Sequence, residues 1–115
     1  MVKYVYSSAQ RGLREWIVQR LSAIFMAVYV IGFVGYLLFN PDVSFAEWHS
    51  LFAKPFMKVA TILFILAILY HAWIGIWTVF TDYVKIDVLR FILNTLVLLM
   101  LFACFFWGLL ILWSV

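Results

Sequence analysis

The spacing between charged residues is the most informative pattern in this sequence. Three long stretches contain no Asp, Glu, Lys or Arg, and they cover residues 21–41, 59–81 and 91–115. Each has close to the ~20 residues that a helix needs to cross ~30 Å of hydrocarbon. In lipid, backbone polar groups must hydrogen-bond within their own segment, so such stretches form helices. The pattern predicts an all-α integral membrane protein with three transmembrane helices, at about 15–39, 56–81 and 88–114.

The segment between the first two spans carries signals for a turn and a short helix. The Asn-Pro-Asp sequence at 40–42 is a turn and stop signal. Ser44 and Glu47 have the spacing of a capping box. One helical face then collects Phe45, Trp48, Leu51 and Phe52. These signals predict an interfacial helix at about 45–53 that ends at the Lys-Pro pair 54–55.

The segment between the second and third spans is shorter and more polar. Residues 82–87 predict a tight link, and Asp87 stands where its carboxylate can cap the third helix. Within the spans, we expect Gly32 and Gly35 to allow close helix contact, and Asn94 to make an interhelical hydrogen bond.

The composition agrees with a membrane environment, because 69% of the residues are hydrophobic and 11% are charged. Soluble domains average about 45–50% apolar and about 25% charged residues, and a small core cannot enclose this much apolar surface. The net charge of +3 is too small and dispersed to suggest nucleic acid. The one cysteine, Cys104, lies in an apolar run, where we expect neither a disulfide nor a metal site. We expect a single membrane-anchor domain over residues 1–115.

Lysine and arginine are distributed unequally between the two sides of the predicted helices. One side, with the N-terminus and the 82–87 link, carries Lys3, Arg11, Arg14, Arg20, Lys85 and Arg90. The other side carries Lys54 and Lys58. Short basic loops stay in the cytoplasm. We therefore expect a cytoplasmic N-terminus and an external C-terminus.

His71 lies within a predicted span, where ionisable residues are costly. Its position leaves two interpretations open, a histidine hydrogen-bonded to a neighbouring helix or an axial ligand of heme iron. Gly75, one turn later on the same face, either leaves space for a flat macrocycle or permits close helix packing. The other histidine, His49, lies on the opposite side of the membrane. If His71 binds heme, the second axial ligand must therefore come from another chain.

Three residues near the cytoplasmic boundary are further candidates. Arg20 begins the first span, and it is either a snorkelling side chain or a counter-ion for heme propionates. Asp82 and Tyr83 stand just beyond the second span. Tyr83 is either an interfacial belt residue or a hydrogen-bond donor to a quinone carbonyl, with the Asp82 carboxylate nearby for proton transfer.

Part of the chain resembles a known family. The sequence His-Ala-Trp-Ile-Gly-Ile-Trp at 71–77, followed by Thr-Asp-Tyr-Val-Lys at 81–85, is similar to the signature of the small hydrophobic membrane anchor of bacterial succinate dehydrogenase (complex II). The Arg-Leu-Ser-Ala sequence at 20–23 also resembles this family, as do the length and the three spans. Ile86 departs from the family pattern, in which proline often follows the lysine that corresponds to Lys85. Without this proline, the backbone of the 82–87 link is expected to be less stiff.

The resemblance implies a role in succinate:ubiquinone oxidoreductase, which connects the tricarboxylic acid cycle to the respiratory chain. The chain would not be catalytic alone. With a larger cytochrome b anchor subunit, it would hold an iron–sulfur subunit and a flavoprotein subunit on the cytoplasmic face of the bacterial inner membrane, with its own C-terminus in the periplasm.

The resemblance also implies the ligands of the site. Heme b would lie between the two anchors, with His71 as one axial ligand of its iron and a histidine of the larger anchor as the other. Arg20 would lie near the heme propionates. Ubiquinone would bind near the iron–sulfur subunit, with Tyr83 as hydrogen-bond donor and Asp82 as a neighbour.

Other functions agree with parts of the sequence. An anchor of another quinone-linked cytochrome b, such as fumarate reductase, has similar spans, although the Thr-Asp-Tyr segment argues against it. Small multidrug transporters are of similar length, but they have four helices and an acidic residue in the first, whereas Glu15 here precedes the apolar stretch. A structural anchor without heme remains open if His71 is only hydrogen-bonded.

Overall fold

Four helices make up the described part of the chain in the computed structural model, which covers residues 2–115, with side chains from residue 12 onward. In order they are α1 (Val2–Phe39), α2 (Phe45–Ala53), α3 (Pro55–Tyr83) and α4 (Asp87–Trp113). Three of them are long and apolar enough to cross a membrane, over Gly12–Phe39, Pro55–Tyr83 and Asp87–Trp113. The predicted all-α fold with three spans is confirmed.

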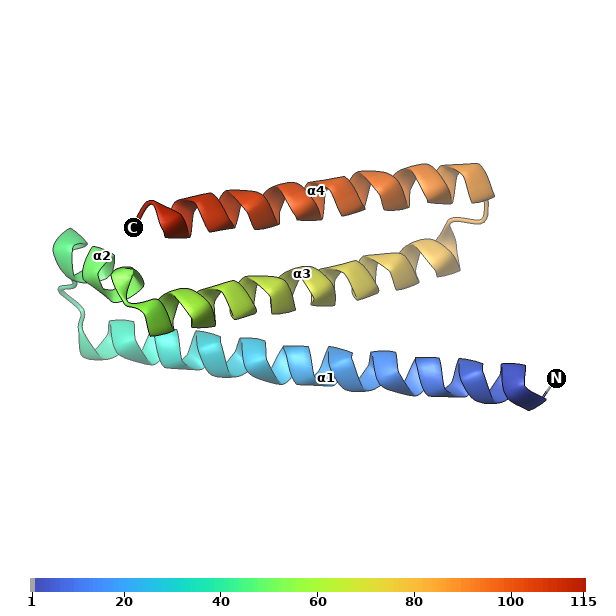
Figure 1. The fold of residues 1–115 in the computed structure, drawn as a ribbon, viewed down its shortest axis with the longest axis horizontal. Coiled ribbons are helices and arrows are strands. Elements are labelled where there is room, and N and C mark those ends of the chain that lie inside the picture. Colours follow the sequence, from blue (N-terminus) through green and yellow to red (C-terminus); the bar gives the residue numbers. More distant parts are fainter. Residues whose placement is uncertain (1) are drawn as a thin grey trace.

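The long helices form one open layer, with α3 between α1 and α4 and neighbours running antiparallel (Figure 1). The N-terminal end of α1 and the link between α3 and α4 lie at one end of the layer. Helix α2 and the C-terminus lie at the other. This arrangement agrees with the sides predicted from the sequence, and it leaves the broad faces of the layer uncovered by the chain itself.

Helix α2 begins and ends where the sequence predicts. The Ser44 hydroxyl oxygen accepts a hydrogen bond from the Glu47 backbone N–H at 3.2 Å, and the Glu47 carboxylate accepts one from the Ser44 N–H at 3.1 Å. Lys54 is extended, as a residue before proline prefers, and Pro55 opens α3. Trp48 packs edge-on against Phe33 of α1, with ring centroids 5.4 Å apart, which holds α2 against the end of the layer.

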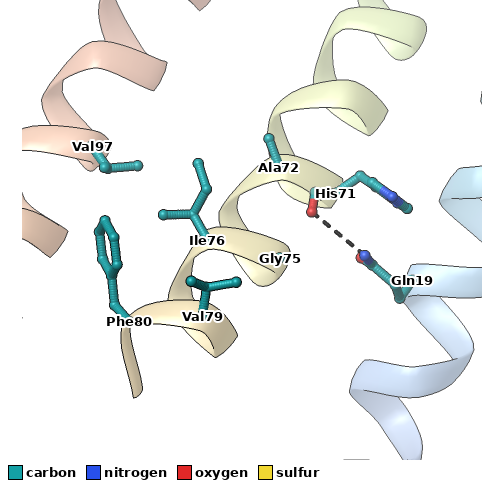
Figure 2. Close-up of a pocket in the computed structure, with 8 residues that line it drawn as sticks. All are labelled: Gln19, His71, Ala72, Gly75, Ile76, Val79, Phe80 and Val97. Carbon is teal, nitrogen blue, oxygen red and sulfur yellow. Dashed lines mark hydrogen bonds between the residues drawn. The ribbon is translucent and has the colours of Figure 1, made fainter. Parts of the chain in front are cut away.

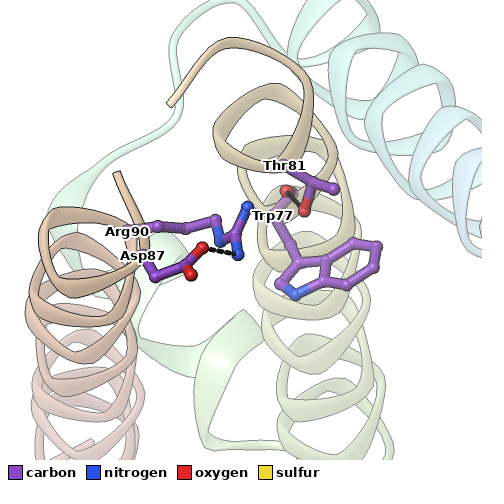
Figure 3. A network of polar contacts seen from close by, with 4 residues as sticks. All are labelled: Trp77, Thr81, Asp87 and Arg90. Atoms are coloured by element: carbon purple, nitrogen blue, oxygen red, sulfur yellow. Dashed lines mark hydrogen bonds and ion pairs between the residues drawn. The ribbon is translucent and has the colours of Figure 1, made fainter. Parts of the chain in front are cut away.

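The link between α3 and α4 is shorter than predicted. Asp82 and Tyr83 are the last residues of α3, so only residues 84–86 connect the helices. The prediction that Asp87 caps α4 is wrong, because Ile86 occupies the cap position and no side chain bonds there. Asp87 is the first helical residue, and its carboxylate accepts a hydrogen bond from the Arg90 guanidinium at 2.8 Å (Figure 3). A carboxylate in the first turn still suits the helix dipole.

Few side chains are buried within the described part of the chain. Leu112 of α4 and Ser22 of α1 are the buried residues there, at 5% and 9% exposure. Helix α4 approaches α3 closely at Gly108, where an added Cβ would lie 3.0 Å from the Ile65 Cδ1 atom. Most large apolar side chains face outward, which is the arrangement expected of helices whose apolar surroundings are lipid and other protein chains.

Three of the predicted helix contacts are not made among the described residues. A Cβ added to Gly32 or Gly35 would meet nothing within 4 Å, so neither glycine lies at a close helix contact in the structure. The Asn94 side-chain oxygen is buried without a hydrogen-bond partner, so it does not make the predicted interhelical bond. Gly32 instead lines a hollow of about 240 Å³ between α1, α2 and α3.

Candidate functional site

His71 lies in the middle of α3, and its imidazole extends toward α1 (Figure 2). The Nδ1 atom is 3.3 Å from the Ser22 hydroxyl oxygen of α1. The Gln19 side-chain amide, one turn earlier in α1, donates a longer hydrogen bond of 3.5 Å to the His71 backbone carbonyl. Two polar residues of α1 thus meet one histidine of α3, and Nε2 forms no hydrogen bond within residues 12–115.

An apolar groove of about 460 Å³ runs beside His71 along α3. It is lined by Gln19, His71, Ala72, Gly75, Ile76, Val79, Phe80 and Val97. A Cβ added to Gly75 would meet nothing within 4 Å, so this glycine does not serve packing inside the chain. Either a flat group or a helix of another chain could occupy the space beside this glycine, so both interpretations of Gly75 stay predictions. The groove can accept a flat apolar group.

Gln19, one of the residues that line the groove, carries an unpaired acceptor. The Gln19 side-chain oxygen is buried and has no hydrogen-bond partner among the described residues. Buried polar atoms are nearly always paired in complete proteins, because an unpaired acceptor costs about 1–3 kcal/mol.

A second polar contact holds α1 against α3 closer to α2 than His71 is. The hydroxyls of Tyr29 and Thr61 are 2.8 Å apart, and the Tyr29 ring stacks on Phe64 with centroids 4.1 Å apart. Neither this pair nor the Ser22 contact was predicted from the sequence. The available signal was that each of these hydroxyls lies within a span, where polar groups need partners.

The other predicted residues lie apart from the groove. Arg20 is exposed at the start of the first apolar stretch and does not line the groove, and its guanidinium carbon is 5.4 Å from the centroid of the Trp16 ring. Asp82 and Tyr83 end α3 and are exposed, Tyr83 at 80%. His71 and Tyr83 belong to one continuous helix, in which twelve residues span ~18 Å.

The described residues offer no multi-ligand metal site. No group of three or more His, Cys, Asp or Glu side chains in that part of the chain could hold a metal ion. His49 is exposed in α2, at the opposite end of the layer from Tyr83. A metal held at His71 would therefore need most of its ligands from another source.

The comparisons with known proteins agree with the resemblance. The family model described as succinate dehydrogenase/fumarate reductase transmembrane subunit matches residues 4–112. The chain is 43% identical to the succinate dehydrogenase hydrophobic membrane anchor subunit of Coxiella burnetii over 106 residues, 92% of each chain. It is 30% identical to the subunit of the same name from Rickettsia felis, over 87% of this chain and 81% of that one. The chain belongs to the family of succinate dehydrogenase hydrophobic membrane anchor subunits.

Proposed function

We propose that this anchor subunit binds heme b jointly with a larger cytochrome b anchor chain, and that it contributes to the site of ubiquinone reduction in succinate:ubiquinone oxidoreductase. The observation that carries the heme proposal is the His71 imidazole, held through Nδ1 by Ser22 beside the open groove at Gly75. A bound heme b supplies a one-electron redox centre within the bilayer.

The donor atoms of the chain favour heme over a simple metal ion. One imidazole without a cluster of further ligands binds an ion weakly, whereas a porphyrin brings four nitrogen ligands of its own. The groove is apolar, as a macrocycle requires. We propose that a histidine of the larger anchor provides the second axial ligand.

The quinone proposal rests on the end of α3. The Tyr83 hydroxyl is exposed there, where it can donate to a quinone oxygen at the membrane interface, and the adjacent Asp82 carboxylate is positioned to pass protons. We propose that the iron–sulfur and flavoprotein subunits dock on this side. Fumarate reductase falls under the same family description, but both relatives compared above are succinate dehydrogenase subunits, which favours succinate oxidation.

The absorption spectrum of the purified complex tests the heme proposal. We expect reduced-minus-oxidised spectra of a low-spin b-type heme, with a heme content close to one per flavin. A complex that assembles, oxidises succinate and contains no heme would show instead that His71 is a structural hydrogen-bonding residue.

Arg20→Leu is expected to weaken heme retention or to lower the reduction potential of the heme. A positive charge near the propionates favours the added electron, so its loss favours the oxidised state. Potentiometric titration of the heme in membranes measures the change, and Arg20→Lys is the control that keeps the charge. Heme content and potential that stay the same in Arg20→Leu would support a snorkelling arginine held at the interface by Trp16.

We propose that the N-terminus and the α3–α4 link face the cytoplasm of a bacterial inner membrane, and that the C-terminus faces the periplasm. Cysteine labelling in a Cys104→Ser background tests this orientation. Ser50→Cys in α2 is expected to react with an impermeant reagent added outside, and Ile86→Cys in the link is expected to stay unlabelled. Labelling of Ile86→Cys but not of Ser50→Cys would show that the protein has the opposite orientation.

A further inference from the structure

We propose that Ser22 is a positioning residue that fixes the tautomer of His71, so that Nδ1 carries the proton and Nε2 presents its lone pair. This inference rests on the proposed heme function and assigns a task to a residue of α1 that does not itself touch the iron. It follows from the hydrogen bonds of a single hydroxyl group.

The Ser22 hydroxyl has one hydrogen to donate. Its oxygen is 2.8 Å from the backbone carbonyl oxygen of Gln19, which can only accept, so the hydroxyl hydrogen is used in that bond. Such a bond to the carbonyl of the preceding turn is common for serine in helices. Toward the His71 Nδ1 atom, at 3.3 Å, Ser22 can therefore act only as an acceptor. The Nδ1 atom must then be the protonated nitrogen, which leaves Nε2 free to bind a metal.

The surroundings of Ser22 favour the tautomer with the proton on Nδ1 over the alternative. Ser22 is 9% exposed and is the buried polar residue of the described chain, so bulk water does not compete for its oxygen. Reversing the tautomer would place a lone pair of Nδ1 against a lone pair of Ser22, unless the hydroxyl gave up its 2.8 Å bond to Gln19. Metal-ligating histidines usually donate their other ring N–H to such an acceptor, which also raises the basicity of the ligating nitrogen.

The Gln19 side chain contributes less to this arrangement. Its amide nitrogen reaches the His71 backbone carbonyl at 3.5 Å, the limit of a hydrogen bond, and this contact does not touch the imidazole. The part of Gln19 that matters for the tautomer is its backbone carbonyl, which every side chain at position 19 would retain. The proposal therefore assigns the effect to Ser22 itself.

Substitution of Ser22 in the assembled complex tests the proposal. Loss of the acceptor makes the imidazole a weaker electron donor, so Ser22→Ala is expected to raise the reduction potential of the heme and to change the low-spin g-values in its EPR spectrum. We expect roughly tenfold weaker heme retention. This is the lower end of the loss of affinity caused by removing a hydrogen-bond partner of a metal-ligating histidine. Ser22→Thr keeps a hydroxyl that can bond the Gln19 carbonyl, and it is expected to restore the parental potential and spectrum.

Tyr29→Phe is the matched control, because it removes another hydroxyl contact between α1 and α3 without touching His71. It is expected to leave the potential and g-values unchanged. Equal shifts in Tyr29→Phe and Ser22→Ala, or no shift in Ser22→Ala, would overturn the proposal. If Ser22→Ala does not assemble, Ser22→Cys takes its place, because its sulfur is a weak acceptor. Ser22→Cys is expected to raise the reduction potential of the heme, and an unchanged potential would overturn the proposal.

All of these outcomes concern a parental complex that contains heme. A parental complex without heme would instead contradict the proposed function itself.

Discussion

His71→Ala is expected to remove one axial ligand from the heme iron and to convert the low-spin spectrum of the complex to a high-spin or heme-free one. The reason is the position of the imidazole beside the groove, with Nδ1 held by Ser22 and no other histidine of this chain near it. The alanine cannot coordinate iron, and α3 is expected to persist because alanine is a good helix former. Optical and EPR spectra of the purified complex measure the loss.

His49→Ala is the control for the loss of a histidine, because His49 is exposed in α2 at the far end of the layer from Tyr83. We expect its heme spectrum to match that of the parent. Succinate oxidation with artificial acceptors is expected to survive in both variants, since the proposed flavoprotein subunit is a separate chain. A bis-histidine spectrum that persists in His71→Ala would falsify the assignment of His71 as a ligand.

The elements set by local signals were predicted well from the sequence. The limits of α2 depend on a capping box within one turn and on a proline directly after the helix, so its predicted range of about 45–53 matches Phe45–Ala53. The spans depend on continuous apolar runs, and their ends at Phe39 and Trp113 lie within about a residue of the prediction. Local chemistry alone was sufficient in these cases.

The helix ends without an apolar or capping signal were predicted less well. Helix α1 begins at Val2 rather than at about residue 15, because a helix can continue through polar residues that the search for apolar stretches excludes. Helix α3 continues through Asp82 and Tyr83 for the same reason. Asp87 pairs with Arg90 one turn later, where the sequence suggested a cap.

The candidate site could be predicted by residue type but not by pairing. A histidine in a span and a glycine one turn later draw attention in the sequence, and both line the groove. That Ser22 faces His71, or that Tyr29 faces Thr61, depends on the relative rotation and depth of α1 and α3, which no single helix encodes. Whether Arg20 and Tyr83 reach cofactors depends on chains outside this one, so both remain predictions.

Tyr83→Phe is expected to cause a marked loss of quinone reduction while succinate oxidation by artificial acceptors is kept. In the proposed site, negative charge would develop on the quinone oxygen as electrons arrive from the iron–sulfur subunit, and a positioned hydroxyl bonds more strongly to a charged oxygen. Loss of such a donor costs about 2–4 kcal/mol of transition-state stabilisation, or roughly a 30- to 1000-fold lower rate. Phenylalanine keeps the ring, and Tyr83 is 80% exposed in the isolated chain, so the fold of α3 is expected to be unaffected.

The measurement is the ratio of succinate–quinone to succinate–dye turnover in the same membranes. Asp82→Asn is expected to lower this ratio less than Tyr83→Phe, because the amide keeps the shape of the side chain and removes only its capacity to pass protons. Tyr36→Phe, in the last turn of α1 at the opposite end of the layer, is the control for an interfacial tyrosine and is expected to leave the ratio unchanged. If the ratio in Tyr83→Phe equals that of the Tyr36→Phe control, the Tyr83 hydroxyl only anchors α3 at the interface. The partner chains alone would then hold the quinone, since the hydroxyl is the single group that this substitution removes.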